Sequence, residues 1–385
     1  MTPSRHPRRA SVLVIVMVTL LFTAFALILF VEQASTDLLV EAREVTARRL
    51  RREAYSALEA TLATLEEFRR ADSGLHGPAE GWADPLRFSG WQPREGCKVE
   101  VALEDESGKL SLPHVDNGTL VALFKSWDFN QADAERLADA LLGWMRRDYV
   151  PASGRSPDYD IGDLPFEAPQ RSLRSWTELA AIDHVREVFY DDQGRPNDLY
   201  RRFTAAFSLY DYDQFNVNGA NPDVLTAVGF ADPTQHNRLH EFLTGTGGYT
   251  AQGPGWLTSN SQAAGVLGTG AMPNLAGTQV RALRITITVR EGKSEFRLAA
   301  VVAPNGGAKI VKTTATDTRA PASAEGTAAS SATVTANAAK PTSTTAAAGS
   351  AATGGTKAQL NYPFTLLEIR EIGEMPPPPP PAPSA

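Results

Sequence analysis

Residues 11–31 carry no charged side chain, and three arginines stand just before them. A run of 21 mostly apolar residues is long enough to cross the hydrocarbon core of a bilayer as a helix, which takes about 20 residues. The arginines, Arg5, Arg8 and Arg9, are expected to stay on the cytoplasmic side, so the chain after this run should lie outside. The sequence therefore predicts a single-pass membrane protein with an exported C-terminal part.

The helical pattern continues beyond the predicted membrane segment. Residues 32–71 contain no Pro or Gly, and apolar side chains recur at spacings of three and four, which places them on one face of a helix. This face consists of Leu50, Ala54, Leu58, Leu62, Leu65 and Phe68. From residue 11, the pattern predicts one helix of roughly 60 residues, about 90 Å long, whose second half packs on a globular domain.

Three later regions alternate apolar and polar residues, as β-strands do. Residues 97–112 should hold two strands around a Ser-Gly turn, residues 280–303 two strands joined at Gly292-Lys293, and residues 362–372 one more. Residues 113–279, between the first two regions, show mostly helical periodicity. The sequence therefore predicts an α+β fold, with a long N-terminal helix on an antiparallel sheet and a large, mostly helical insert between strands.

Two segments have biased composition. Residues 305–358 are mainly Ala, Thr, Ser and Gly, so they cannot bury a core and are expected to form a disordered linker. Residues 375–385 form a Pro-rich tail. Cys97 is the only cysteine, which excludes an intrachain disulfide, and we expect it to be a small core residue at the start of a strand.

The start of the chain resembles the leader of type IV pilins and pseudopilins. In that family a peptidase cuts between a basic leader and a long apolar helix, and the helix stays in place. The resemblance implies a leader of residues 1–10, cut between Ala10 and Ser11, and a pilin-like fold. Most members have Gly at the cut and Glu as the fifth mature residue, where this chain has Ala10 and Ile15. An ordinary signal anchor is the alternative.

Four motifs in the insert add to this resemblance, because they follow the order found in the minor pseudopilin K family of type II (general) secretion systems, whose members also lack that Glu. They are a helix end at 144–148, an acidic loop at 156–163, a helix start at 176–179 and a turn at 215–218. Arg146 replaces an acidic family residue, the loop differs in type from the family's, and the linker and Pro-rich tail are not family features.

The resemblance implies assembly rather than chemistry. The expected role is to cap or initiate a short periplasmic filament, the pseudopilus, from the inner membrane. The expected partners are the I- and J-type minor pseudopilins and the inner-membrane secretion platform. A minor pilin of a type IV pilus is one alternative. A signal-anchored periplasmic enzyme or sensor, with the insert as its active domain, is another.

Four carboxylates invite a metal interpretation. Asp148 ends a predicted helix, and Asp158, Asp160 and Asp163 follow in one loop. Carboxylates in a short loop suit a hard cation such as calcium, which takes 6–8 oxygen ligands, and the resemblance implies calcium binding in this insert. The spacing is not that of an EF-hand. A solvated acidic loop, with Arg146 and Arg147 beside it, is the alternative.

Other function classes receive no support from the sequence. His236 and His240 are four apart, but the zinc-protease Glu is missing, and no nucleophile elbow or phosphate-binding loop occurs. We therefore expect no enzymatic activity. Asn216 and Asn218 should satisfy backbone groups in a turn, with Asn221 capping the next helix. That element resembles DNA-binding hairpins, but residues 113–278 hold 12 Lys and Arg against 21 Asp and Glu, which argues against nucleic acid.

Overall fold

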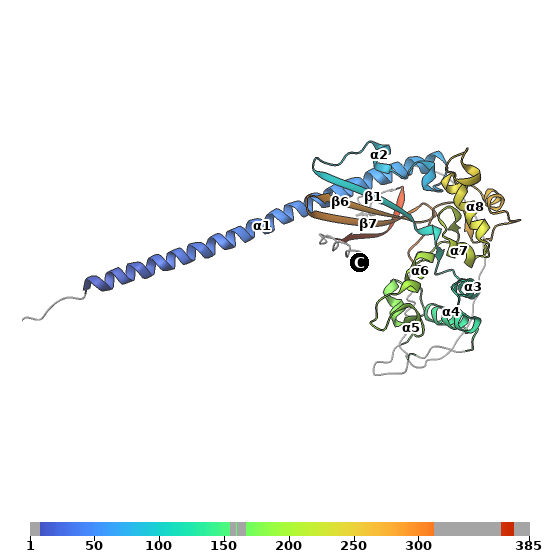
Figure 1. The fold of residues 1–385 in the computed structure, drawn as a ribbon, viewed down its shortest axis with the longest axis horizontal. Helices are drawn as coiled ribbons and strands as arrows, with labels where there is room; N and C mark the ends of the chain where they lie inside the picture. Colours follow the sequence, from blue (N-terminus) through green and yellow to red (C-terminus); the bar gives the residue numbers. More distant parts are fainter. Residues whose placement is uncertain (1–7, 155–158, 160–166, 312–362, 373–385) are drawn as a thin grey trace, which may run out of the picture. The chain divides into compact units, whose positions relative to one another are not determined.

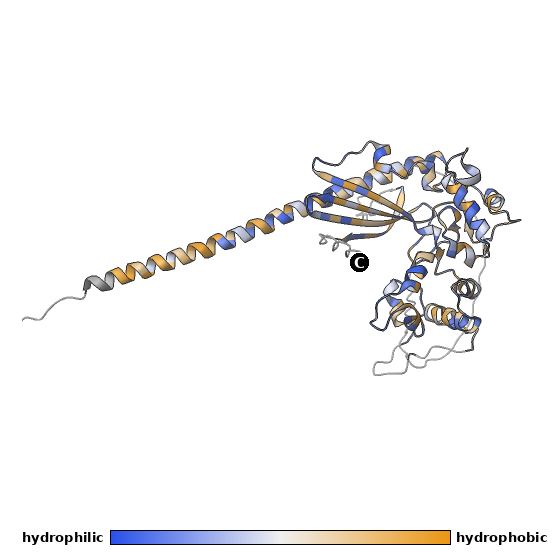
Figure 2. Cartoon of the chain, in the orientation of Figure 1, coloured by the Kyte–Doolittle hydropathy of each residue, from blue (hydrophilic) through white to orange (hydrophobic). Residues whose placement is uncertain are grey.

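The first helix is continuous through the predicted membrane segment. The computed structural model describes residues 8–154, 159, 167–311 and 363–372, and α1 (Arg8–Ala71) spans 64 residues (Figure 1). Within these described residues, α1 is the one helix long and apolar enough to cross a membrane. Figure 2 shows that its apolar colouring is concentrated in the N-terminal half. The large apolar side chains of residues 13–31 are exposed there, as a single membrane anchor requires.

The second half of α1 packs on a four-stranded antiparallel sheet of order β1-β6-β7-β8. Its strands are β1 (Cys97–Asp105), β6 (Leu283–Glu291), β7 (Ser294–Pro304) and β8 (Phe364–Ile372). β1 pairs with β6 from Cys97 opposite Glu291 to Asp105 opposite Leu283. β6 and β7 form the predicted hairpin, in which Gly292 takes a positive φ of 60° that suits glycine. The predicted last strand is β8, which lies at the sheet edge.

The apolar stripe predicted on α1 is confirmed. Leu50, Ala54, Leu58, Leu62 and Leu65 are buried and Phe68 is partly buried, in one core with the facing side chains of β6 and β7. Burial of each leucine contributes about 1.5–3 kcal/mol. A loop with a short 3₁₀ turn, η1 (Pro78–Glu80), and α2 (Pro85–Ser89) follows α1. We call the second half of α1, this loop and the sheet the body.

Residues 113–279, the insert, are mostly helical as predicted and have their own core, in which Phe124, Leu137, Phe203 and Phe207 are fully buried. The helices are α3 (Asn117–Ser126), α4 (Gln131–Met145), α5 (Val185–Phe189), α6 (Asp198–Ala206), α7 (Pro222–Ala227), α8 (Pro233–Thr244) and α9 (Asn260–Leu267), with 3₁₀ turns η3 (Trp176–Ala181), η4 (Val217–Gly219) and η5 (Gly247–Tyr249). The α+β class with a helical insert between strands is thereby confirmed.

The helix caps predicted at Asn130 and Asn221 in the insert are confirmed. The Asn130 side chain accepts a hydrogen bond from the Asp133 amide at the start of α4. Asn221 accepts from the Val224 amide, and Pro222 occupies the first turn of α7. Each cap satisfies a backbone donor that a helix start leaves without an intrahelical partner.

Both strands predicted around the Ser-Gly turn within 97–112 are present, but the second does not belong to the main sheet as expected. Residues 106–108 form the turn η2 (Glu106–Gly108), and β2 (Leu110–Ser111) leaves the sheet to pair in parallel with β3 (Phe207–Ser208). A second parallel pair joins β4 (Phe215–Asn216) to β5 (Ala276–Gly277). The Ser107 amide fixes the turn, because it donates hydrogen bonds both to the Asp105 side chain and to the Ala282 carbonyl oxygen. These contacts redirect the chain towards the insert.

The prediction that Cys97 is a core residue was also wrong. It begins β1, the other edge strand, and is half-buried rather than a core residue. Burial raises the pKa of its thiol, with a smaller contribution from Glu291 in the same direction. A raised pKa keeps the thiol protonated and unreactive.

Candidate functional site

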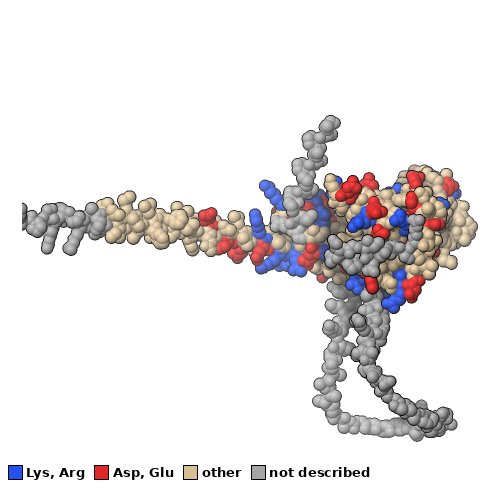
Figure 3. All heavy atoms as spheres, turned by 90° about the horizontal axis from the view of Figure 1, so that it is seen from below, with Lys and Arg blue, Asp and Glu red and all other residues tan. Residues whose placement is uncertain are grey.

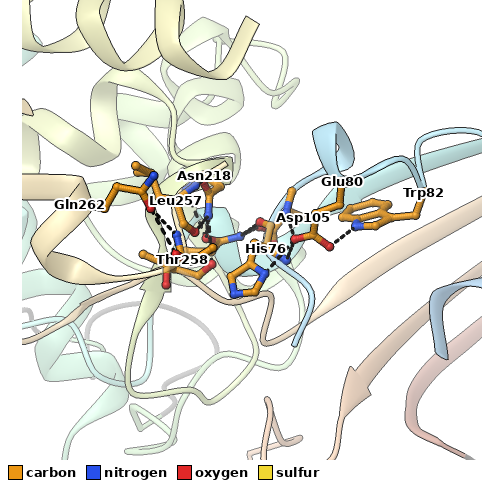
Figure 4. A network of polar contacts seen from close by, with 11 residues as sticks. His76, Glu80, Trp82, Asp105, Asn218, Leu257, Thr258 and Gln262 are labelled. Carbon is orange, nitrogen blue, oxygen red and sulfur yellow. Dashed lines mark hydrogen bonds and ion pairs between the residues drawn. The ribbon is translucent and has the colours of Figure 1, made fainter. Parts of the chain in front are cut away.

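A network of polar side chains joins the body to the insert, just beyond the end of α1 (Figure 4). The loop after α1 closes around Glu80, whose side chain is completely buried. One Glu80 carboxylate oxygen accepts from the His76 amide at 2.5 Å and lies 2.8 Å from His76 Nδ1, and the other accepts from Trp82 Nε1 at 3.0 Å. Because an unpaired buried carboxylate is very costly, these contacts fix the loop and direct the His76 carbonyl towards the insert.

Asn216 connects three segments that are distant in sequence. Its amide Nδ2 donates to His76 O and to Asp105 Oδ2, both at 2.7 Å. Asp105 Oδ1 in turn accepts from the Ser107 amide at 2.9 Å and the Ser107 hydroxyl at 2.5 Å. Asn216 thus ties the loop after α1 and the end of β1 to the insert.

Asp105 sits in an environment that disfavours its charge. Removal from water raises the pKa of its carboxyl to about 6, although hydrogen bonds from Ser107 and Asn216 act in the opposite direction. The Gly219 backbone lies directly against it: a Cβ at Gly219 would be 2.5 Å from Asp105 Oδ2. A Cβ at Gly108 would be 2.3 Å from Gly219 O. The two glycines therefore allow the body and the insert to meet backbone to backbone.

Asn218 completes the network on the insert side. Its Oδ1 accepts from the Leu257 amide at 2.7 Å, while Nδ2 donates to Leu257 O, Thr278 O and Asn216 Oδ1 at 2.9–3.1 Å. The predicted role of Asn216 and Asn218 in satisfying backbone groups is confirmed: Asn216 Oδ1 accepts from the Asn218 amide within the turn at 3.2 Å. Their other backbone partners, at residues 76, 257 and 278, lie far outside the turn. We call the contacts of His76, Glu80, Asp105, Asn216 and Asn218 the junction network.

The exposed length of α1 is a second candidate surface. Beyond the membrane segment, Leu38, Leu39, Val40 and Val45 remain exposed. Figure 3 shows a stretch without charged residues along α1, followed by acidic and then basic side chains. We define the acidic band as Glu32, Asp37, Glu41 and Glu44, a segment that also contains Arg43, and the basic band as Arg48, Arg49, Arg51 and Arg52. Arg48, Arg49 and Arg51 also pair within the chain, with Glu44, Glu291 and Glu371. The centres of the two bands are about 12 residues apart, or roughly 17 Å along the helix.

The predicted leader and metal residues are only partly described. α1 runs through Ala10 and Ser11 without a break. Asp148 lies just beyond α4 with a positive φ of 57° and an exposed side chain. Asp158, Asp160 and Asp163 lie outside the described residues. Among the residues that are described, no group of three or more His, Cys, Asp or Glu side chains could hold a metal ion.

Sequence reasoning missed Asp139, which organises the segment entering the acidic loop. Its Oδ1 accepts from Tyr149 OH at 2.6 Å and the Ala152 amide at 3.0 Å, and Oδ2 accepts from the Ser153 amide at 2.7 Å. Burial alone would raise the pKa of Asp139, but the hydrogen bonds from Ser153 and Tyr149 lower it. A lone carboxylate in the apolar run of residues 137–142 was the available signal.

The sequence matches no protein-family profile and no curated protein. Among solved structures, the chain is similar to a chain in the crystal structure of the GspK-GspI-GspJ complex from the enterotoxigenic Escherichia coli type 2 secretion system. The two are 14% identical, the alignment covers 68% of this chain and 94% of that chain, and the TM-score is 0.47.

Proposed function

We propose that this chain is a minor pseudopilin of a type II secretion system that initiates or caps the periplasmic pseudopilus. The observation that carries the proposal is α1 itself: an apolar segment behind a leader-like start continues unbroken into a helix packed on a sheet. A subunit of this form keeps one end in the inner membrane before assembly and offers the same exposed helix to neighbouring subunits afterwards. The role is assembly and not catalysis.

The position of the insert supports placement at a filament end. The chain enters the insert at the end of β1 and leaves it at the start of β6, and the junction network lies at residue 76, just past Ala71. The insert therefore projects from the end of the body opposite the membrane segment (Figure 1). A bulky domain there blocks the space that a further subunit would need, so growth continues only on the membrane side.

The charge order along α1 supports staggered neighbours. A parallel helix with the same order, displaced by roughly 17 Å, would place its basic band against the acidic band defined here. Each exposed pair contributes little, in general below about 1 kcal/mol, but the pattern penalises other offsets through like-charge contacts. We propose the I- and J-type minor pseudopilins as the neighbours, and the inner-membrane platform as the site of assembly.

Purification of the tagged full chain from cells with a complete secretion system tests this proposal. Mass spectrometry should find a mature N-terminus at Ser11, after cleavage behind Ala10, and the I- and J-type pseudopilins in the same preparation. Replacing the four residues of the acidic band by Lys should reduce this co-purification at least severalfold. Asp192→Lys with Asp213→Lys, two exposed positions in the insert, is the matched control and should leave it intact. A chain that begins at Met1 despite active peptidase, and that purifies alone, would refute the proposal.

We further propose calcium for the loop that holds Asp148, Asp158, Asp160 and Asp163. If the loop brings these carboxylates together, they repel one another, and a divalent ion would remove that repulsion. A ligand that binds only the folded state adds about 2.7 kcal/mol at a hundredfold excess over its Kd, so the chain should melt higher in millimolar calcium than in chelator. Asp158→Ala with Asp160→Ala should abolish the difference. An equal melting temperature in both buffers rules out the site and leaves the pseudopilin proposal untouched.

A further inference from the structure

The last strand is joined to its neighbour by far more chain than the pairing needs. Pro304 at the end of β7 lies directly opposite Phe364 at the start of β8, yet residues 305–363 separate them. Antiparallel neighbours are commonly joined by two to five residues. The predicted disordered linker does not begin at residue 305, because Lys309 forms a two-way backbone bridge with Asp211 and Ala308 is buried. Residues 312–362 of the connection lie outside the described residues. The entropic cost of closing a connection grows with its length, so docking β8 costs more here than with a short turn. The connection therefore weakens the tie between β8 and the sheet.

The contacts of β8 compensate for this by reaching three parts of the molecule. Phe364 is buried in the core beneath α1, and Leu367 is buried against the core of the insert. Glu371 Oε1 accepts from Tyr55 OH at 2.6 Å and from Arg51 Nε at 2.9 Å, both on α1. Glu368 accepts from Tyr210 OH of the insert at 2.5 Å. The site that β8 occupies therefore suits a strand with apolar residues at its first and fourth positions and carboxylates at its fifth and eighth, as in Phe364–Ile372.

β1 and β7, the two strands that flank β6, differ in the protection of their outer sides. On β1, the outward Lys98, Glu100 and Glu104 are charged, which discourages pairing with a further strand. β7 has charged residues only near its start, Glu295 and Arg297, since residues 298–303 are all Leu, Ala or Val. Without β8, this long apolar strand would present unpaired backbone groups, the kind of edge that captures other strands. The β7 edge must be filled, and the structure fills it with a strand on a long connection.

We propose that β8 is a separable strand, and that the groove it fills also binds the β8 strand of a second copy of this chain. The β8 groove is formed by β7, by Arg51 and Tyr55 of α1, and by Tyr210 of the insert. The connection of 59 residues can span at most about 3.3–3.6 Å per residue, which is ample for a copy held nearby in the same membrane to supply its strand. Strand exchange between copies should increase with protein concentration. It should compete with internal docking when that concentration approaches the effective concentration of a chain's own β8 at its own sheet, which is on the order of millimolar. This inference does not depend on the proposed function.

Cysteine pairing in the full chain tests strand exchange. Ala299 on β7 and Arg370 on β8 are directly opposite and neither is buried. In a Cys97→Ser background, one tagged copy carries Ala299→Cys and a second, differently tagged copy carries Arg370→Cys. Mixed in detergent under oxidising conditions, they should form a disulfide-linked heterodimer whose yield rises with protein concentration. A single chain with both substitutions should form the bond internally, which verifies the geometry.

Two further arms separate docking from chance collision. Adding Glu371→Ala to the Arg370→Cys copy removes the contacts to Arg51 and Tyr55, and should lower the heterodimer yield roughly fivefold to tenfold. Thr365→Ala is the matched control, since Thr365 is exposed on β8 and makes no side-chain hydrogen bond among the described residues. Excess synthetic peptide of residues 362–373 should compete. A heterodimer insensitive to both Glu371→Ala and the peptide overturns the proposal, as does its absence at every concentration while the double-cysteine chain closes.

Discussion

Replacing Asn218 by alanine is expected to lower the free energy of unfolding by roughly 3–5 kcal/mol. The substitution removes all four hydrogen bonds of the side chain and leaves the Leu257 amide, the Leu257 carbonyl and the Thr278 carbonyl without that partner. Each buried backbone group left unpaired costs about 1–3 kcal/mol. Urea unfolding of the full chain in detergent, followed by tryptophan fluorescence, measures the change.

The matched control is Asn274→Ala, in the same insert. Asn274 is exposed, and its side chain makes no hydrogen bond among the described residues, so the change should stay within about 0.5 kcal/mol. If Asn218→Ala costs no more than this control, the Asn218 contacts do not hold the insert. A large loss that appears only in the insert's own transition, with the body unfolding as before, would place the effect within the insert and not at the junction.

Features set by neighbouring residues were predictable from the sequence. The stripe from Leu50 to Phe68 depends on helical spacing alone, and the caps at Asn130 and Asn221 depend on a side chain reaching an amide three residues away. The β6–β7 hairpin likewise follows from two alternating runs around a short turn. In each case the stabilising contact lies within a few residues, so the local pattern contains the whole signal.

The exit of the chain from the sheet after Asp105 could not be predicted in the same way. Residues 110–112 alternate as a strand does, but the close approach of Gly108 to Gly219 decides where they go. The partners of Asn218 at positions 257 and 278 are equally remote. The raised pKa of Asp105 also results from burial that only the folded chain creates. The path of the chain after Asp105, the partners of Asn218 and the pKa of Asp105 all depend on contacts between residues far apart in the chain. A local sequence pattern does not contain these contacts.

The junction network has a consequence for assembly. A polar network in which every group is paired favours one arrangement over others, because a shifted arrangement leaves buried groups unsatisfied. An insert attached through apolar contacts alone would tolerate small rotations more easily. If the insert terminates a filament, a fixed orientation relative to α1 is what such a role needs. The network supplies it through Asn216 of β4, whose side chain donates to the loop after α1 and to Asp105 of β1.

Stability is expected to depend on pH through Asp105. Its carboxyl has a pKa of about 6 in the folded protein, against 3.8 ordinarily. Above pH 6 the group is charged in both states, and the folded protein bears the full cost of burying the charge. As the pH falls from 7 towards 4, the folded state takes up the proton first. The free energy of unfolding should therefore rise by about 2–3 kcal/mol from this group.

The difference between the parent chain and Asp105→Asn isolates this effect, because other carboxyls titrate equally in both. The pKa values of Glu66 and Glu371 are lowered by hydrogen bonds from Arg69 and Tyr55, so their contributions to the free energy of unfolding decrease as the pH falls. A measurement on the parent chain without this comparison would therefore show only part of the Asp105 effect. Between pH 7 and pH 4, urea unfolding should show the parent gaining about 2–3 kcal/mol relative to Asp105→Asn. Asp213→Asn, at an exposed position, should track the parent. A constant difference between parent and Asp105→Asn would mean that Asp105 keeps its ordinary pKa, and that the junction is more hydrated than its contacts imply.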